Sequence, residues 1–167
     1  MYHKIFAIAF LLAFCSSTFA QNRDKSVYVE LMGPSDMLGV SYDARIKPDS
    51  KLGYRVGVAY ASPYLLNIDD AQRFISVPLG LNYLAGKGKH RLEVGAGASP
   101  GIYHHSENYK SKNDFGCIAF GTVGYRYTAS NGIQIRCGVS PYVTFGNKYA
   151  DKKVRPLYPY LSIGYAF

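Results

Sequence analysis

The sequence contains no tryptophan, only three cysteines, and few charged residues, which make up 18% of its 167 positions. Hydrophobic residues make up 48%, so the chain does not have the low hydrophobicity and high charge of an intrinsically disordered protein. No apolar run reaches the roughly 18 residues that a transmembrane helix needs. The length fits one domain. What the sequence does hold in excess is tyrosine, with 16 residues.

Residues 1–20, MYHKIFAIAFLLAFCSSTFA, have the pattern of a secretory signal peptide. A basic start precedes an apolar run of ten residues from Ile5 to Phe14, and Ala20 ends a small-residue cleavage site. A buried N-terminal helix is the alternative for this segment. We expect export to the periplasm, with residues 21–167 as the mature domain.

Cys15 raises the possibility of a lipoprotein, in which a cysteine becomes the lipidated first residue. The residue before such a cysteine should be small, whereas here it is the bulky Phe14. The sequence therefore favours a signal peptide that is cleaved after Ala20 over lipidation at Cys15.

Almost every segment after residue 21 alternates between apolar and polar positions with a period of two, which is typical of strands with two different faces. In the last segment Leu161, Ile163 and Tyr165 oppose Ser162 and Gly164. No segment has a convincing helical period. The alternation predicts eight strands at residues 26–32, 37–46, 52–61, 74–84, 90–103, 115–128, 133–145 and 156–167.

Short and long connections tend to alternate along this series. The short ones, at 47–51, 85–89 and 129–132, contain turn signals, and the longer polar ones are 62–73, 104–114 and 146–155. The connection at 33–36 is the exception, because it is short although its place in the series is that of a long connection. Outer-membrane barrels place short turns toward the periplasm and longer loops outward. The chain fits that arrangement in six of its seven connections.

The apolar face carries no Lys, Arg, Asp or Glu in any of the eight segments, whereas the other face combines small residues with charged ones. An ordinary solvated strand face is the alternative, but it would be rich in Lys and Glu, and here the cations are all Arg. Small residues and Arg–carboxylate pairs suit the narrow interior of an eight-stranded barrel. We therefore predict an internal ion-pair network of Glu30, Asp43, Arg45, Arg55, Arg91, Glu93, Arg126 and Arg136.

These faces predict an all-β fold, an eight-stranded antiparallel up-and-down transmembrane β-barrel. A spanning sheet must close on itself, because unpaired backbone groups are too costly in hydrocarbon. Aromatic residues cluster on the apolar face near the short-turn end, where an interfacial girdle belongs: Tyr42, Tyr54, Tyr83, Tyr125, Tyr127, Tyr165 and Phe167. Four prolines oppose regular pairing and belong at edges or bulges: Pro78, Pro100, Pro141 and Pro159.

The signal peptide, the eight alternating strands and the C-terminal Leu161-x-Ile163-x-Tyr165-x-Phe167 resemble the small outer-membrane β-barrel family of Gram-negative bacteria. The resemblance implies location in the cell outer membrane, contact with its lipid, and an assembly signal at these four residues for the barrel-assembly machinery. It implies no particular activity, since the family includes anchors, adhesins and lipid-modifying enzymes. We expect a monomer with a plugged lumen, a structural or surface-interaction role, no catalysis, no cofactor and no nucleic-acid partner.

The two remaining cysteines could form a disulfide in an oxidising compartment. A three-residue turn at 130–132 places Cys137 opposite Tyr125 and Cys117 opposite Phe145. The cysteines are then roughly 27 Å apart, at ~3.4 Å per residue. We expect no disulfide at that separation.

Two features of the longer connections suggest other roles. His104-x-Ser106 is similar to the His-x-Ser arrangement of outer-membrane lipid A deacylases, which makes a lipid A-modifying hydrolase the alternative function. His104 and His105 could also hold a metal, although no fixed third ligand accompanies them.

A cationic outer rim could attract lipopolysaccharide phosphates through Lys110, Lys112, Lys148, Lys152, Lys153 and Arg155. A soluble secreted barrel with an apolar lumen for a small ligand is a further alternative.

Overall fold

The computed structural model describes residues 23–62, 73–107, 110–146 and 154–167. In order, the elements in this part of the chain are β1 (Lys25–Met32), the 3-10 turn η1 (Gly33–Ser35), β2 (Leu38–Arg45), β3 (Leu52–Ala61), β4 (Arg73–Ser76), β5 (Leu79–Ala85), β6 (His90–Glu107), β7 (Lys110–Thr128), β8 (Ile133–Val139), β9 (Tyr142–Phe145), β10 (Val154–Arg155) and β11 (Pro159–Ala166). Within these residues, no helix is long and apolar enough to cross a membrane.

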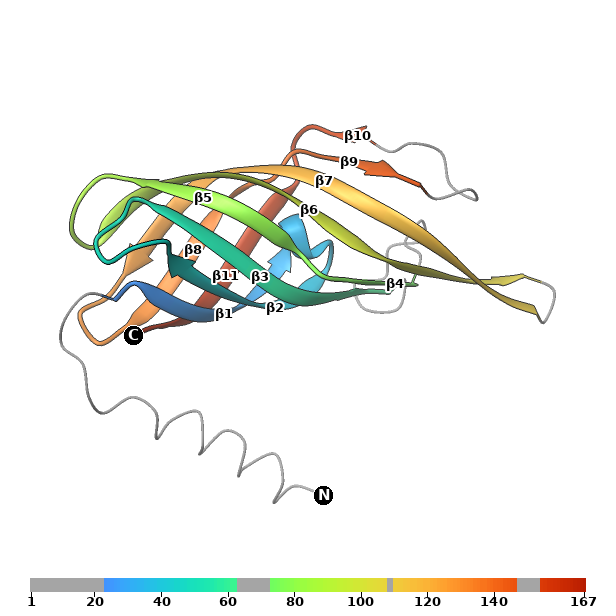
Figure 1. Ribbon diagram of the computed structural model, residues 1–167, viewed down its shortest axis with the longest axis horizontal. Coiled ribbons are helices and arrows are strands. Elements are labelled where there is room, and N and C mark those ends of the chain that lie inside the picture. The colour runs from blue at the N-terminus through green and yellow to red at the C-terminus, as the bar shows by residue number, and fades with distance from the viewer. Residues whose placement is uncertain (1–22, 63–72, 108–109, 147–153) are drawn as a thin grey trace, which may run out of the picture.

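The strands close into an antiparallel barrel of eight strands, as the sequence predicts (Figure 1). β4 with β5, and β8 with β9, each take the place of one predicted strand. β10 lies in the connection predicted at 146–155, where it pairs with β9, so that prediction is wrong for Val154 and Arg155. β1 pairs with β2 on one side and with β11 on the other, so the first and last strands complete the ring. The start of β1 and the end of β11 therefore lie together, at the end where the short turns are.

Two of the interruptions coincide with prolines, at Pro78 between β4 and β5 and at Pro141 between β8 and β9. Proline has no N–H to donate, but its carbonyl still accepts. Gly57 N–H donates to the Pro78 oxygen and Gly121 N–H to the Pro141 oxygen, each at 2.9 Å. The inward–outward alternation continues across both breaks. These prolines divide the predicted strands without changing which residues face inward.

β6 and β7 continue past the other strands as a long hairpin arm (Figure 1). The prediction of a loop at 104–114 is therefore wrong, because pairing continues from His104 with Asn113 to Glu107 with Lys110. An arm that extends beyond the barrel need not have one apolar face. The alternation of apolar and polar residues therefore stops before the strands themselves end. Lys110 and Lys112 consequently lie in β7 and not in a loop.

The polarity of the two faces is the reverse of that in a water-soluble sheet. On the outward face Val58 and Leu92 are each 61% exposed and Ile163 is 60% exposed, whereas the inward Arg136 is only 2% exposed. The same inversion holds around the ring of described strands. The interior therefore contains the charged groups, and its two ends differ in chemistry.

Candidate functional site

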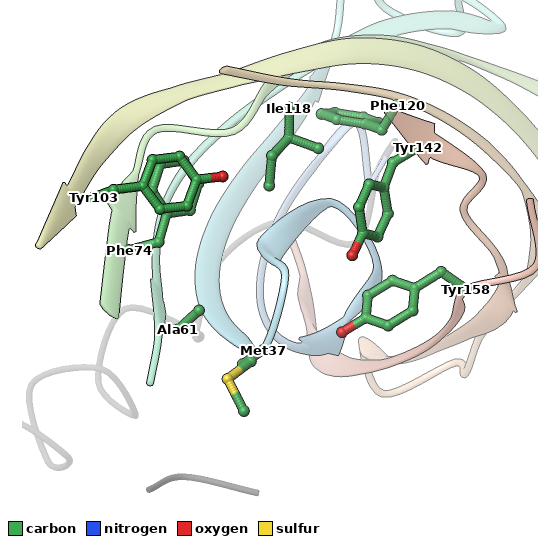
Figure 2. Close-up of a cluster of buried hydrophobic side chains, with 8 residues drawn as sticks. All are labelled: Met37, Ala61, Phe74, Tyr103, Ile118, Phe120, Tyr142 and Tyr158. Atoms are coloured by element: carbon green, nitrogen blue, oxygen red, sulfur yellow. The ribbon is translucent and has the colours of Figure 1, made fainter. Parts of the chain in front are cut away.

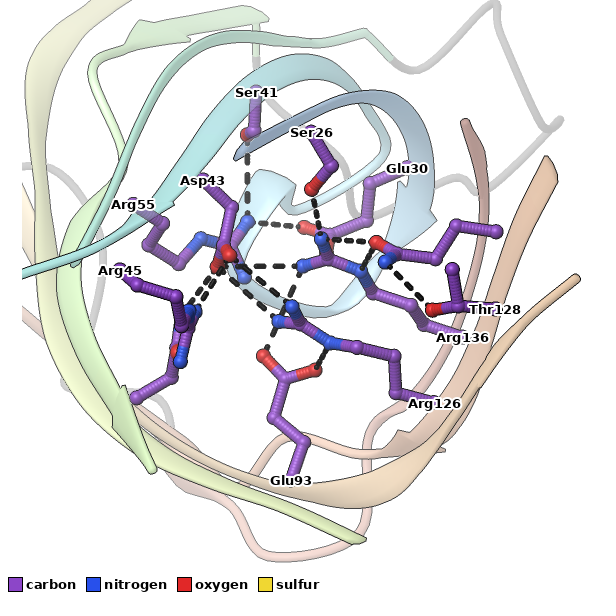
Figure 3. Close-up of polar contacts among 12 residues, drawn as sticks. Ser26, Glu30, Ser41, Asp43, Arg45, Arg55, Glu93, Arg126, Thr128 and Arg136 are labelled. Atoms are coloured by element: carbon purple, nitrogen blue, oxygen red, sulfur yellow. Dashed lines mark hydrogen bonds and ion pairs between the residues drawn. The ribbon is translucent and has the colours of Figure 1, made fainter. Parts of the chain in front are cut away.

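Seven charged side chains meet inside the barrel toward the short-turn end (Figure 3). Each occupies an inward position of an alternating strand, which is why residues far apart in sequence converge. They are Glu30 from β1, Asp43 and Arg45 from β2, Arg55 from β3, Glu93 from β6, Arg126 from β7 and Arg136 from β8. We call this set the ionic cluster.

Asp43 is the centre of the ionic cluster, since three guanidinium groups surround its carboxylate. Its Oδ1 accepts from Arg45 Nη2 at 2.6 Å and from Arg126 Nη1 at 3.1 Å. Its Oδ2 accepts from Arg126 Nη2 at 3.2 Å and lies 3.6 Å from Arg136 Nη1. Asn82 also donates to Oδ2. The buried carboxylate of Asp43 thus offsets part of the positive charge of three arginines, which come from three different strands.

Glu93 supplies the second carboxylate for the same arginines. Its Oε2 accepts from Arg126 Nε at 2.7 Å, and its Oε1 lies 3.8 Å from Arg136 Nη1. Arg126 stands directly opposite Arg136 on β8 and opposite Arg91 on β6. Like charges that face each other across strands are destabilising. The carboxylates that reach across the interior remove that penalty for Arg126 and Arg136.

Glu30 and Arg55 form a second ion pair, with Oε1 to Nη2 at 2.9 Å. The ring of Tyr28 connects this pair to the rest, because the Arg136 guanidinium lies 3.8 Å and that of Arg55 5.5 Å from its centroid. Such contacts are strongest when the cation is desolvated, as here. Tyr28 is not one of the residues predicted for the network, although its inward position in the alternating pattern of β1 is visible in the sequence.

Neutral side chains provide further hydrogen bonds to two of the guanidinium groups, those of Arg136 and Arg45. Gln134 Oε1 accepts from Arg136 Nε at 2.7 Å, and Ser26 Oγ accepts from Arg136 Nη2 at 2.7 Å. Asn82 Oδ1 accepts from Arg45 Nη2 at 2.5 Å. These residues are uncharged, so a search for charged side chains does not find them. Their positions on the inward face of alternating strands could have identified them as partners of the arginines.

Arg91 differs from its predicted place in the network. It is half-buried, and its Nε donates to the Gly88 carbonyl oxygen at 3.2 Å. Arg91 is the second residue of β6 and lies two positions after the turn at 85–89. Its guanidinium therefore reaches the turn backbone and not the carboxylates deeper in the barrel.

The other end of the interior holds a buried apolar group, which we call the aromatic cluster (Figure 2). It consists of Met37, Ala61, Phe74, Tyr103, Ile118, Phe120, Tyr142 and Tyr158. Phe74 stacks on Tyr103 with centroids 4.1 Å apart, and Tyr142 meets Tyr158 edge-on at 5.0 Å. Ile118 and Phe120, which interrupt the polar face of the 115–128 segment, are members of this cluster.

The short connection at 33–36 folds into the barrel between the two clusters. Pro34 and Ser35 are fully buried. Ser35 Oγ donates to Glu30 Oε1 at 2.8 Å, and Ser99 Oγ donates to the Pro34 oxygen at 2.9 Å. Gly33 has a φ of 60°, and a Cβ there would lie 2.6 Å from Cβ of Tyr160. The connection is short because it turns inward, which accounts for the exception in the loop pattern.

The predicted assembly signal lies along the last strand and the chain end. Leu161, Ile163, Tyr165 and Phe167 all face outward. The register of the cysteines is as predicted, with Cys137 opposite Tyr125 and Cys117 opposite Phe145, and both cysteines are free.

His104 and Ser106, the pair similar to the lipid A deacylase arrangement, lie in the arm of β6 and β7. His104 Nδ1 hydrogen-bonds with Asn113 Oδ1 at 2.8 Å, and Ser106 pairs with Ser111 in the ladder. The described residues include no group of three or more His, Cys, Asp or Glu that could hold a metal ion. The Arg155 guanidinium lies 5.6 Å from the centroid of Tyr158. Outside the described residues lie the 1–20 segment with Cys15, and Lys148, Lys152 and Lys153.

Comparison with known proteins adds a likeness in fold. No protein-family model and no curated protein sequence matches the chain. The fold is similar to that in the crystal structure of the N-terminal β-barrel domain of Pseudomonas aeruginosa OprF, with a TM-score of 0.61 and 12% sequence identity. The match covers 86% of this chain and 95% of that chain. This likeness supports the closed antiparallel barrel.

Proposed function

We propose that the protein is an integral outer-membrane β-barrel with a closed lumen and a structural or cell-surface interaction role, without catalysis. The observation that carries the proposal is the inverted polarity of the barrel. Large apolar side chains cover the outside, while seven charged side chains are buried inside. Soluble monomers rarely expose apolar patches larger than a few hundred Å². A hydrocarbon environment removes that penalty.

The outward aromatic residues support the same orientation. Tyr54, Tyr83 and Tyr125 are all exposed on the outside of the barrel, as are Tyr165 and Phe167 near the chain end. All belong to the parts of their strands nearest the short turns. Aromatic girdles occupy this position in outer-membrane barrels, where one end of the ring is apolar and the other is hydrated. The short turns and the chain end would then face the periplasm.

Closure of the lumen is proposed from the side chains that fill it. Arg126, Arg136 and Asp43 meet across the interior at one level, and η1 folds into it at the next. A charged interior is also the opposite of what the soluble ligand-binding alternative requires. Contacts with lipopolysaccharide at the cationic residues, and recognition of the terminal strand by the assembly machinery, remain part of this proposal.

Gel mobility in SDS tests the proposal directly. The outer-membrane fraction is compared before and after boiling, and we expect a shift that appears only on boiling, because a closed barrel resists SDS. Val58→Arg provides a second readout: on a lipid-facing surface near the bilayer centre it should cost about 2–4 kcal/mol. Recovery of the protein from the soluble fraction, or no shift on boiling, would overturn the membrane assignment.

A further inference from the structure

A cavity of about 560 Å³ opens at the short-turn end of the barrel. Its rim comes from the start of β1 and from the three turns that join β2 to β3, β5 to β6 and β7 to β8. Its floor includes Asp43, Arg45 and Arg126, so the ionic cluster closes the cavity from below. The size is in the range of small-molecule sites, which are roughly 300–1,000 Å³.

The lining of the cavity is strongly cationic. Of the described residues that line it, eight are Lys or Arg and three are Asp. One of those three, Asp43, is already surrounded by the guanidinium groups of Arg45, Arg126 and Arg136. A concave surface lined by one sign of charge focuses the field and concentrates counter-ions. The rim therefore favours an anion.

Neutral backbone carbonyls hold several of these guanidinium groups in place. Arg23 donates to the oxygens of Ala129 and Ser130, and Arg91 donates to that of Gly88. Arg45 Nη1 donates to the Lys51 oxygen at 3.1 Å. A carbonyl orients a guanidinium without cancelling its charge. Remaining N–H groups are then available for an anion, at little further loss of side-chain freedom.

The lysines of the rim add mobile charges to these oriented arginines. Lys87 and Lys89 flank Gly88 in the turn before β6, and both are exposed. Arginine forks match phosphate oxygens bidentately, while lysine acts as a point charge. Among the described residues that line the cavity, Leu84 is the one large apolar side chain, so this lining does not suit an acyl chain.

We propose that this cavity binds a small, soluble, phosphate-bearing polyanion from the compartment that the short turns face. The cavity lies inside the ring of strands, away from the apolar outer surface, which favours a soluble phosphate compound over a lipid headgroup. The proposal goes beyond the proposed function and does not depend on it, since the cavity exists in the barrel wherever the barrel is located.

Calorimetric titration with inorganic tripolyphosphate tests the site. The full chain, purified in a neutral detergent, should bind it saturably, with an affinity that falls as salt is raised. Arg23→Gln combined with Arg91→Gln should weaken binding at least tenfold. Neither residue belongs to the ionic cluster, and an unchanged circular dichroism spectrum would show that the variant is folded.

The matched control is Lys110→Gln combined with Lys112→Gln, which removes the same charge from the arm at the opposite end. We expect this variant to bind within twofold of the parent. No saturable binding, or equal weakening in both double variants, would overturn the site. Citrate serves as a polyanion probe that carries carboxylates in place of phosphates, and an affinity equal to or above that of tripolyphosphate would overturn the preference for phosphate.

Discussion

The two ends of the barrel interior are built on different principles. The ionic cluster is held by ion pairs and hydrogen bonds between individual groups, and Asp43 alone contacts three guanidinium groups. In the aromatic cluster, residues such as Phe74 and Tyr103 contribute through packed area. Buried ion pairs add little net stability, but removal of one partner leaves uncompensated charge. In the ionic cluster, substitution of a single charged residue should therefore lower the free energy of unfolding strongly. In the aromatic cluster, the loss should be proportional to the buried apolar area that a substitution removes.

The largest expected effect is at the centre of the ionic cluster. Asp43→Asn keeps the size of the side chain but leaves Arg45, Arg126 and Arg136 with one fewer negative charge. We expect the free energy of unfolding to fall by about 3–5 kcal/mol. Urea titration followed by circular dichroism in detergent or vesicles measures this change.

Asp49→Asn is the control for that substitution, because Asp49 is exposed in a turn and its φ of 61° is also accessible to Asn. Its effect should stay within about 0.5 kcal/mol. If Asp43→Asn changed stability no more than Asp49→Asn, the ionic cluster would not have the dependence on one carboxylate that its geometry indicates.

At the aromatic end, Phe74→Ala should reduce the free energy of unfolding by about 3 kcal/mol, from lost transfer energy and a residual cavity. Phe74 is 1% exposed and stacks on Tyr103, whereas Phe115 is 63% exposed on the outside. Phe115→Ala is therefore the matched control, with less than half the effect in the same urea titration. Equal losses would show that the aromatic cluster is not packed as a core.

The turn η1 connects the two ends and should be sensitive to backbone geometry. Gly33→Ala places a Cβ in contact with Tyr160 at a φ of 60°, and we expect a loss of about 1–2 kcal/mol. Gly88 has a φ of 73° with open space around it, so Gly88→Ala isolates the backbone contribution. A Gly33→Ala effect no larger than that of Gly88→Ala would contradict the close packing of η1 against β11.

The alternation of residue types predicted most of the fold because it is set by which environment each face meets. It identified the eight strands and the direction of the charged side chains, while the turn at 130–132 set the register that separates Cys117 from Cys137. Strand ends were less predictable. Pro78 and Pro141 interrupt strands that a pattern reads as continuous, and the arm of β6 and β7 continues where the alternation stops.

Within the interior, composition predicted charge but not connectivity. Asp43 faces Arg55 directly across β2 and β3, yet Arg55 pairs with Glu30. Asp43 pairs instead with Arg45 on its own strand and with the arginines of β7 and β8. Which charged side chains form ion pairs across the barrel interior depends on how the barrel closes and on the lengths of the side chains. A local sequence pattern gives no information on either. The inward position of η1 could not be predicted either, because the sequence shows only that the connection is short.

The smallest expected effect compares two buried serines. Ser99 Oγ donates to the Pro34 oxygen and fixes η1 to β6, whereas Ser162 Oγ, beside the ionic cluster, has no hydrogen-bond partner among the described residues. Ser99→Ala should cost about 1 kcal/mol, because the Pro34 carbonyl would lose its buried donor. Ser162→Ala should be neutral or slightly stabilising. The difference between the two urea titrations measures the contribution of the Ser99–Pro34 hydrogen bond, and equal values would mean that this bond does not help to hold η1 in the barrel.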